Sequence, residues 1–410
     1  MIRAPVAPLP KTMRFLLYSH DSYGLGHLRR SVTIAGRLLE QCPGASVLIA
    51  TGSPVATSFR LPRGVDILKL PSVTKDRGGS YISREWSMGL ADLLEFRARL
   101  LVSAVEGFRP HVLLVDHKPT GLLGELKSAL KTARSLGARC VLGLRDIVDH
   151  PDAMESEWGS ADVRAAIEDG YDQIMVYGDR EIFDASVEYP QLAAVKDRLI
   201  FTGYVVRPRV RPPIRPLALL QPHVVVTVGG GEDGADRVSA YLDAAELDEP
   251  FWSTTIVLGP LFGSDSGKEV KRRAATVRGV TVHRSHDDLP SLFRDASTVV
   301  SMAGYNSCAE ILQARIPSVL LPRVTPRREQ LLRASRLSAR GLVRNADGAK
   351  PDELLKEIHA ALEDRRITRP LPSMLGAQKA AAVLLRGAIV TGGSALDVQT
   401  AHATPTELAS

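Results

Sequence analysis

Residues 301–310 read SMAGYNSCAE and residues 322–330 read PRVTPRREQ. The first stretch follows an apolar run, turns through Gly304 and enters a predicted helix near Ser307. The second repeats this order after the apolar residues 318–321. In open parallel sheets such strand–turn–helix joints lie at the edge where ligands bind, and helix N-termini there favour phosphate. With carboxylates available for sugar hydroxyls, the two joints predict a nucleotide-sugar site.

Short apolar runs alternate with amphipathic helical patterns along most of the 410 residues. The runs are typical of buried parallel strands and fall into two series. They are residues 14–18, 46–50, 111–115, 140–144 and 173–177, then 224–228, 253–258, 280–282, 298–300 and 318–321. We therefore predict an α/β fold with two Rossmann-like, doubly wound domains that face a central cleft.

Composition shifts divide the chain into six predicted segments. Residues 207–216 contain four prolines, which cannot donate hydrogen bonds inside a sheet, so they indicate a linker. The tail after residue 390 is rich in Gly, Ser, Thr and Ala. The predicted segments are a disordered N-terminus (1–12), an N-terminal domain (13–206), a linker (207–220), a C-terminal nucleotide-sugar-binding domain (221–372), a helix crossing to the first domain (373–390) and a disordered tail (391–410).

The bulk composition narrows the class of protein. With 44% hydrophobic and 24% charged residues, the chain is typical of a soluble globular protein. The net charge is only +6, and no run of basic residues is interleaved with aromatic residues. We therefore expect no nucleic-acid partner. Cys42, Cys140 and Cys308 are scattered, which argues against disulfides or a cysteine zinc site. No signal peptide or membrane span is predicted, so we expect a cytoplasmic location.

The first strand is followed by residues 20–27, HDSYGLGH. Gly24 and Gly26 let the backbone pass close to a ligand. A dinucleotide fingerprint would need a third glycine where Arg29 stands, so we rank nicotinamide binding low. The positive charges of Arg29 and Arg30 are unfavourable at the start of a helix, where the helix dipole favours negative charge. Either a bound anion or simple solvent exposure would explain them.

The first domain has two candidates for a general base, His27 in the joint that follows the first strand and Asp116 at the end of another strand. His27 has an ordinary pKa near neutrality, as deprotonation of a sugar hydroxyl requires, but it could equally bond a neighbouring carbonyl. Asp116 could act as the base or orient His27, or it could cap the following helix. Arg145 and Asp146 could bind phosphate or pair internally, and we favour the structural alternative.

Gly229, Gly230 and Gly231 follow the first strand of the second half. We see no packing reason for three glycines there, and they suit a loop that approaches a diphosphate. Glu232 and Asp233 oppose this by placing negative charge nearby, or they help to cap the next helix.

Glu310 has two competing roles. The spacing from Ser307 to Glu310 fits a capping box, in which the carboxylate holds the helix start together. Alternatively, Glu310 accepts hydrogen bonds from both ribose hydroxyls of a nucleotide. A Glu310→Gln variant separates these roles, because glutamine preserves a capping box but weakens ribose binding.

Residues 325–330 predict the start of another helix. Thr325 is a good N-cap and Pro326 suits the first helical position. Glu329 and Gln330 would then lie in the first turn, facing either the cleft or water. The strand-end residue Arg323 before them favours contacts with sugar hydroxyls.

The paired motifs AGYNSxxE and PRxxxRxEQ resemble those of family 28 glycosyltransferases of the GT-B fold, a MurG-like group, and especially a bacterial branch known as predicted glycosyltransferases. The resemblance covers residues 13–386 and is strongest over 301–337. It implies that Glu310 binds the ribose and that Gly304, Asn306 and Ser307 approach the diphosphate. It further implies that Glu329 and Gln330, following Arg323, meet the donor sugar.

The resemblance also places Gly24 and Gly26 in an acceptor-side loop, with His27 on the family's histidine. The chain departs from the family pattern at residues 21–23 and at residues 232–233, where acidic or bulkier residues stand. These departures concern the acceptor and the phosphate geometry rather than the fold.

We therefore expect a hexosyltransferase that moves a sugar from a nucleoside diphosphate, with UDP the first candidate, to a hydroxyl acceptor. Inversion by direct displacement is expected, with His27 and Asp116 as catalytic residues. No metal or tightly bound cofactor is expected, because no Asp-x-Asp pattern occurs in the cleft segments. The alternatives are an epimerase or hydrolase on the same fold and a non-catalytic nucleotide-sugar-binding protein.

Contact with the inner face of the membrane is a further hypothesis. It rests on residues 86–96, whose apolar members recur at helical spacing beside Arg97 and Arg99. An ordinary core-facing helix is the alternative.

Overall fold

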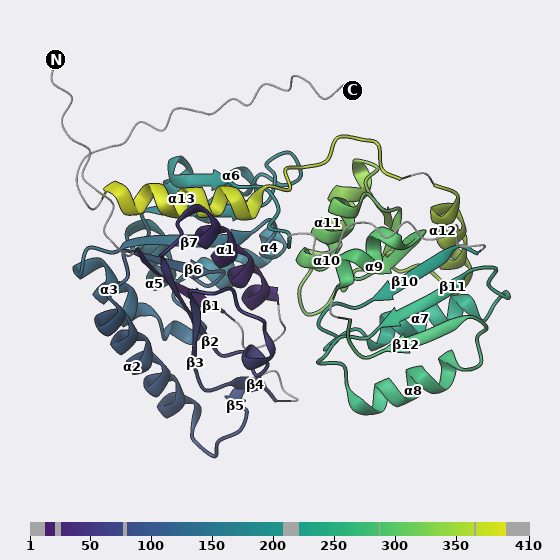
Figure 1. Ribbon diagram of the computed structural model, residues 1–410, viewed down its shortest axis with the longest axis horizontal. Helices are drawn as coiled ribbons and strands as arrows, with labels where there is room; N and C mark the ends of the chain where they lie inside the picture. Colours follow the sequence, from purple (N-terminus) through teal and green to yellow (C-terminus); the bar gives the residue numbers. More distant parts are fainter. Residues whose placement is uncertain are drawn as a thin grey trace.

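The computed structural model describes residues 13–20, 26–76, 80–207, 221–286, 288–364 and 366–390. Two separate parallel sheets, each with its own helices, form two α/β domains that lie side by side (Figure 1). The predicted fold class is therefore confirmed. The predicted disordered ends, most of the predicted linker and Gly24 lie outside the described residues.

The first domain has a seven-stranded sheet with the order β3-β2-β1-β6-β7-β8-β9. Neighbouring strands in it all pair in parallel. Its strands are β1 (Arg14–Ser19), β2 (Ser46–Thr51), β3 (Val65–Lys69), β6 (Val112–Asp116), β7 (Arg139–Arg145), β8 (Gln173–Tyr177) and β9 (Leu199–Phe201).

The second domain has a six-stranded parallel sheet with the order β12-β11-β10-β13-β14-β15. Its strands are β10 (His223–Thr227), β11 (Ser253–Val257), β12 (Val280–His283), β13 (Thr298–Ser301), β14 (Ser318–Leu320) and β15 (Arg344–Asn345).

Helices cover both sheets. In the first domain they are α1 (Gly26–Gln41), α2 (Leu90–Phe108), α3 (Lys127–Ser135), α4 (Pro151–Trp158), α5 (Ala161–Asp169) and α6 (Ala185–Glu188), with 3₁₀ turns at Ala56–Ser58, Leu122–Gly124 and Pro190–Arg198. In the second they are α7 (Ala235–Ala245), α8 (Ser264–Ala274), α9 (Leu289–Asp295), α10 (Tyr305–Ala314), α11 (Glu329–Ala339) and α12 (Pro351–Glu363).

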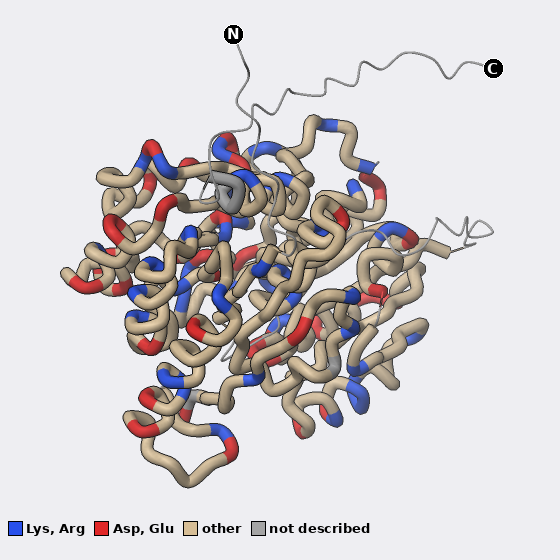
Figure 2. The backbone as a smooth tube through the Cα atoms, turned by 60° about the vertical axis from the view of Figure 1, so that its left-hand side comes forward, with Lys and Arg blue, Asp and Glu red and all other residues tan. Residues whose placement is uncertain are grey.

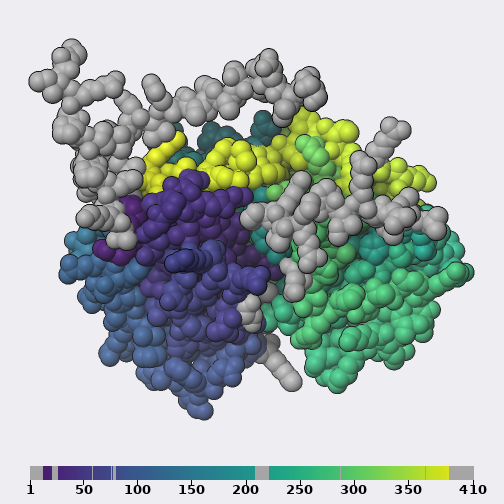
Figure 3. Space-filling view, in the orientation of Figure 1, coloured from purple at the N-terminus to yellow at the C-terminus, as the bar shows by residue number. Residues whose placement is uncertain are grey.

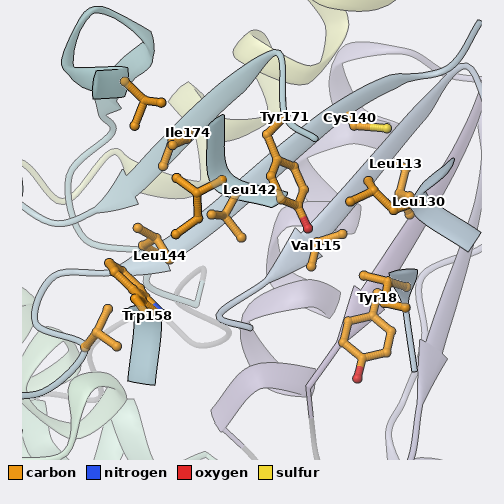
Figure 4. Packing of buried hydrophobic residues seen from close by; sticks show 14 of the residues in the cluster. Tyr18, Leu113, Val115, Leu130, Cys140, Leu142, Leu144, Trp158, Tyr171 and Ile174 are labelled. Atoms are coloured by element: carbon orange, nitrogen blue, oxygen red, sulfur yellow. The ribbon is translucent and has the colours of Figure 1, made fainter. Parts of the chain in front are cut away.

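Alternate residues of the first sheet enter two different cores, as the pleat requires. Leu113 and Val115 of β6 join Leu142 of β7 and Trp158 of α4 in one cluster, which Figure 4 shows from close by. The intervening Leu114 faces the opposite cluster, beneath α1. Because both faces are covered, the inner strands β6, β7 and β8 are almost wholly buried and largely apolar, which is why they could be found in the sequence.

The last helix, α13 (Gly376–Val390), lies across the first domain although it follows the second in sequence (Figures 1 and 3). Its residues Ala380, Ala381 and Leu384 are buried in the cluster that contains the core of α1. The chain thus passes twice between the domains, and the space-filling view shows the two domains in contact.

Several features differ from the sequence prediction. The edge strand β3 and the hairpin of β4 (Val73–Lys75) with β5 (Tyr81–Ser83) were not predicted, because these short, partly exposed segments lack apolar runs. No described helix is long and apolar enough to cross a bilayer. Acidic and basic residues are interspersed over both domains (Figure 2), as the small net charge suggested.

Candidate functional site

The topology brings His27 and Asp116 together. The strands β1 and β6 are neighbours in parallel register, so the segments that leave their carboxyl ends lie at one edge of the sheet. His27 is in the first turn of α1 and Asp116 is the last residue of β6. Nδ1 of His27 lies 2.6 Å from Oδ2 of Asp116. Asp116 does not cap the following helix, which was the alternative role. Its carboxylate instead contacts His27 and accepts hydrogen bonds from Arg30.

Arg30, one turn along α1, holds the other side of the carboxylate. Its Nη2 donates to both oxygens of Asp116, at 2.9 and 2.8 Å. Arg30 is buried, so solvent exposure does not explain this arginine near the helix start. The reason is an ion pair with a residue from another strand, which the sequence could not show.

The short contact to a carboxylate fixes the tautomer of His27. A distance of 2.6 Å between Nδ1 and an ionised oxygen requires a proton between them, so Nδ1 donates to Asp116. The 2.8 Å approach of Arg30 Nη2 to the same nitrogen is then a contact and not a hydrogen bond. Nε2 of His27 consequently carries the lone pair. This is the arrangement of a general base that a carboxylate orients.

The protonation states agree with that role. Burial lowers the pKa of His27 to about 4, although Asp116 opposes the shift. Burial alone would raise the pKa of Asp116, but the charges of Arg30 and His27 lower it to about 2. Near neutral pH the imidazole is therefore neutral and the carboxylate ionised. The side chain of His27 is 14% exposed, so a substrate can reach it.

Two further imidazoles, which the sequence did not single out as site residues, surround His27. The ring of His117 lies 5.0 Å from that of His27, and the ring of His20 lies 6.0 Å from it. His20 follows β1 and His117 follows β6. Burial lowers the pKa of both, so they too are neutral near pH 7. The sequence feature that could have identified His20 and His117 as site residues is that each directly follows a strand.

The helix α10 forms the opposite wall. It begins at Tyr305, with Gly304 in extended conformation as the N-cap and no side-chain cap. The prediction of a start near Ser307 is therefore wrong. Ser307 is the third helical residue and Glu310 the sixth, so the capping-box role for Glu310 is also wrong: Glu310 lies too far along the helix to reach its start.

Glu310 lies between the domains. It is 3% exposed, and its Oε1 accepts a hydrogen bond of 2.8 Å from Nε of Arg207. Burial lowers the pKa of Arg29 in α1, and the negative charge of Glu310 opposes that shift. Glu310 is therefore near α1 of the first domain. Asn306 of α10 donates from Nδ2 to the carbonyl oxygen of Gly26 at 3.3 Å. The first turns of α1 and α10 thus face each other across the domain boundary.

The glycine loop lies beside the start of α10. Gly229 has φ of +66°, and a Cβ built there would lie 3.9 Å from Oγ of Ser307. Gly231 has φ of +96°, and its Cβ would lie 2.4 Å from the carbonyl oxygen of Leu258. The expectation that these glycines have no packing purpose is therefore wrong for Gly231. Gly229 leaves backbone near the N-terminus of α10, as a phosphate-binding loop requires.

The acidic residues after this loop do not cap α7, whose N-cap is Gly234 without a side-chain cap. Asp233 instead pairs with Arg323 from the other joint. Burial and the neighbouring Asp233 raise the pKa of Glu232 to about 7. Glu232 therefore carries only part of its charge near neutral pH, which reduces its conflict with a bound diphosphate.

Glu329 and Gln330 are buried and hold Arg323. Nη2 of Arg323 donates to Oε1 of Glu329 at 2.8 Å, and its main-chain N–H donates to Oε1 of Gln330 at 3.1 Å. The second carboxylate oxygen of Glu329 is buried without a hydrogen-bond partner among the described residues. These side chains therefore do not face water, which was one of the two alternatives.

The helix α11 begins at Glu329, with Arg328 as N-cap, so the predicted start at Thr325 and Pro326 is wrong. The first domain holds the preceding segment: the main-chain N–H of Arg328 donates to Oδ1 of Asp149 at 2.9 Å. In addition, Nη2 of Arg327 donates to Oε2 of Glu157 in α4 at 3.0 Å.

Asp146 joins the two domains. Both of its oxygens accept hydrogen bonds from Arg333 of α11, at 2.8 and 2.7 Å, and both residues are fully buried. The hydroxyl of Tyr204 also donates to Asp146, at 3.1 Å. Asp146 thus has the structural role that we favoured, but its ion-pair partner belongs to the other domain. Arg145 has no carboxylate within ion-pair distance in the described part of the chain.

Known structures share this architecture. The glycosyltransferase of kitacinnamycin is 17% identical, with 94% of this chain and 97% of that chain covered and a TM-score of 0.56. MurG of Acinetobacter baumannii is 14% identical, with 90% and 95% covered and a TM-score of 0.54. A UGT transferase from Siraitia grosvenorii, solved in complex with UDP, is 13% identical, with 92% and 94% covered and a TM-score of 0.53.

The sequence matches no protein-family model and, at a significant level, no curated protein. At these low identities the structural matches establish the fold. The protein has the GT-B fold, and its structural neighbours are glycosyltransferases. The more specific relationship to family 28 stays a prediction. Likewise, the described residues contain no group of three or more metal-ligating side chains placed to hold an ion, and metal-independent chemistry stays a prediction.

Proposed function

We propose that the protein transfers a hexosyl group from a nucleoside diphosphate donor to a hydroxyl acceptor. The observation that carries this proposal is the His27–Asp116 pair on the edge of the first domain, directly opposite the start of α10 in the second. A neutral imidazole whose Nε2 carries the lone pair is suited to remove a proton from a hydroxyl group. A helix N-terminus beside a glycine loop is suited to a diphosphate leaving group.

The proposed reaction is a single displacement. Nε2 of His27 takes the proton from the acceptor hydroxyl as its oxygen attacks the anomeric carbon. The bond from that carbon to the diphosphate oxygen breaks with its electron pair, so the configuration inverts and the nucleoside diphosphate leaves. Asp116 stabilises the imidazolium that forms, and the N–H groups at the start of α10 stabilise the leaving group.

The donor would be held by the second domain. Glu310 would accept hydrogen bonds from the ribose hydroxyls and share its carboxylate with Arg207, because a carboxylate has about four acceptor sites. Gly304, Asn306 and Ser307, together with the Gly229–Gly231 loop, would approach the diphosphate. Glu329 and Gln330, which hold Arg323, would meet the sugar. UDP is our first candidate for the nucleotide, and GDP and dTDP are the others.

Donor binding can be tested without knowledge of the acceptor. UDP, GDP and dTDP should each be screened for a rise in melting temperature, because a ligand that binds the native state stabilises it. The best ligand should bind Glu310→Gln about 10- to 100-fold more weakly, which reflects about 1.5–3 kcal/mol for a hydrogen bond to a charged group. Glu363→Ala, at an exposed site of α12 in the same domain, is the control. Equal affinities of Glu310→Gln and the control would exclude the ribose role.

Contact with a membrane surface is proposed for a separate patch near α2, within a cytoplasmic protein. The helix begins at Leu90, so Trp86 and Met88 precede it and the helical spacing predicted for residues 86–96 fails at its start. Trp86, Met88 and Phe96 are nevertheless exposed, and the rings of Trp86 and Phe96 lie 6.0 Å apart. Sedimentation with anionic vesicles at low salt should be lost in Trp86→Ser. An absence of sedimentation by the wild type would refute the contact.

A further inference from the structure

Arg145 is a cation beside the His27–Asp116 pair, and no carboxylate of the described residues lies within ion-pair distance of it. The other cations near it each have a carboxylate partner: Arg30 with Asp116, Arg333 with Asp146, and both Arg327 and Lys118 with Glu157. Arg145 instead donates from Nη2 to the carbonyl oxygen of Val148 at 3.1 Å. Its Nε is buried and has no hydrogen-bond partner among the described residues.

His117 is a second buried group with an unused nitrogen. Its Nδ1 is buried and likewise has no partner in the described chain. The main-chain N–H of His117 donates to the carbonyl oxygen of Gly143 in β7, at 2.8 Å. The strands β6 and β7 are neighbours, so His117 and Arg145 leave the same edge of the sheet. His117 also has a φ of +72°, which is rare for a residue with a side chain and clusters at functional sites.

The electrostatics place Arg145 close to the reacting groups. After burial, Arg145 is the largest cause that lowers the pKa of His117. Burial is also the main cause of the low pKa of His27, with Arg145 among the minor ones. Burial lowers the pKa of Arg145 itself, and Glu329 of the second domain is the strongest charge opposing this. Arg145 is therefore close enough to interact electrostatically both with the proposed base and with Glu329, which is proposed to meet the donor sugar.

Unpartnered buried polar atoms are costly, at about 1–3 kcal/mol each, and are uncommon in native proteins. Among the described residues, Nε of Arg145 and Nδ1 of His117 are two such atoms on adjacent strand ends beside a positive charge, and an anionic oxygen of a ligand would satisfy them. The guanidinium group of arginine matches phosphate and carboxylate in a bidentate manner. We propose that Arg145, together with His117, binds a phosphate or carboxylate group of the acceptor, next to the hydroxyl that His27 deprotonates.

This inference rests on the proposed function and narrows it to acceptors that carry an anionic group. The acceptor is favoured over the donor because Arg145 and His117 belong to the domain that carries His27. The residues proposed for the diphosphate, Gly229–Gly231 and the start of α10, belong to the other domain. An anion beside His27 would also raise the pKa of this base, whose low value in the ligand-free protein makes it a weak proton acceptor.

Inorganic phosphate is the probe for the test. Imidazole resonances of the full-length protein should be followed by NMR during a phosphate titration at constant ionic strength. The wild type should show saturable shifts of His117 and His27 and a raised pKa of His117. Arg145→Gln should bind phosphate at least 10-fold more weakly. Arg145→Lys, which keeps the charge but loses the planar fork, should lie between them. Arg327→Gln, which removes a paired arginine, is the control and should bind within about threefold of the wild type.

A second arm distinguishes the donor from the acceptor as the source of the anion. Calorimetry with the nucleoside diphosphate that binds best should give affinities within about threefold for the wild type and Arg145→Gln. Phosphate should still bind when that nucleotide is saturating. Competition between the two, or a parallel loss of nucleotide affinity in Arg145→Gln, would assign Arg145 to the donor and overturn the proposal.

Phosphate binding that is absent in the wild type or unchanged in Arg145→Gln would also overturn the proposal. Failure of the proposed function has a different signature, because none of UDP, GDP and dTDP would then bind the wild type at all. In that case a phosphate site at Arg145 would no longer count as an acceptor site.

Discussion

Replacement of Asp116 by asparagine tests the link between the buried ion pair and the proposed chemistry. The carboxylate has a pKa of about 2 in the folded protein, against an ordinary value of 3.8. A lowering of this size corresponds to about 2–3 kcal/mol of stability. Because the folded-state pKa is lowered, this contribution is present above pH 3.8 and is lost as the pH falls towards 2. Asp116→Asn should therefore be less stable than the wild type at pH 7, and the difference should shrink in acid.

The same substitution should slow sugar transfer. Without the carboxylate, nothing stabilises the imidazolium of His27, and its pKa should fall below its present value of about 4. General base catalysis contributes about 10²–10⁴-fold, so we expect kcat to fall by roughly 100-fold or more. The assays are urea denaturation between about pH 2 and pH 7, the window over which the contribution of Asp116 is lost, NMR titration of His27, and product formation under donor saturation.

A matched control separates catalysis from folding. Glu125 forms a comparable buried pair with Arg97, with contacts of 2.5 and 2.7 Å, in the same domain. Glu125→Gln should lose a similar amount of stability and keep kcat within about threefold, since removing one partner of a buried pair is destabilising wherever it lies. If Asp116→Asn kept full activity, or if both variants lost activity equally, the orienting role of Asp116 would be refuted.

Three further predictions concern the domain boundary, the glycine loop and metal ions. Arg333→Met should lower the free energy of unfolding by about 3–5 kcal/mol because it leaves Asp146 buried and unpaired, and adding Asp146→Asn should recover part of that loss; simply additive losses in urea denaturation would contradict the pairing. The pKa of about 7 at Glu232 predicts that nucleoside diphosphate affinity falls as the pH rises from 6 to 8, because ionisation places negative charge beside the loop. This dependence should weaken in Glu232→Gln, and identical calorimetric profiles would rule out proximity to the diphosphate. Transfer should continue in the presence of a chelator, and a strict requirement for added Mn²⁺ would refute the metal-free mechanism.

The fold could be predicted because its strands are buried on both faces. The apolar runs that become β1, β2, β6, β7 and β8 alternate with helices at regular intervals, which leaves a doubly wound sheet as the simplest solution. The strand β3 was missed for the opposite reason: it lies at the edge of the sheet and Asp66 interrupts its apolar pattern. Local signals at helix ends were less reliable, because tertiary contacts with the first domain set the start of α11.

The candidate site was predicted in part. His27 and Asp116 could be proposed because each stands near a strand end, where a parallel sheet collects its ligand-binding residues. Their partner Arg30 could not be recognised, since 86 residues separate it from Asp116 and spacing carries no information about that pairing. The Asp146–Arg333 pair likewise depends on how the two domains meet. Spacing also does not show that the described residues place no carboxylate within ion-pair distance of Arg145.

The central claim is that His27 activates an acceptor for transfer from a nucleotide-sugar. Its most direct test is to incubate the protein with UDP-, GDP- and dTDP-hexoses and a library of hydroxyl compounds that includes phosphate and carboxylate esters, and to detect added sugar mass by mass spectrometry. We predict glycosylated product with the wild type, and at least a 100-fold lower rate with His27→Ala at unchanged donor affinity. Equal product formation by His27→Ala, or donor consumption in which water is the sole acceptor, would contradict the account.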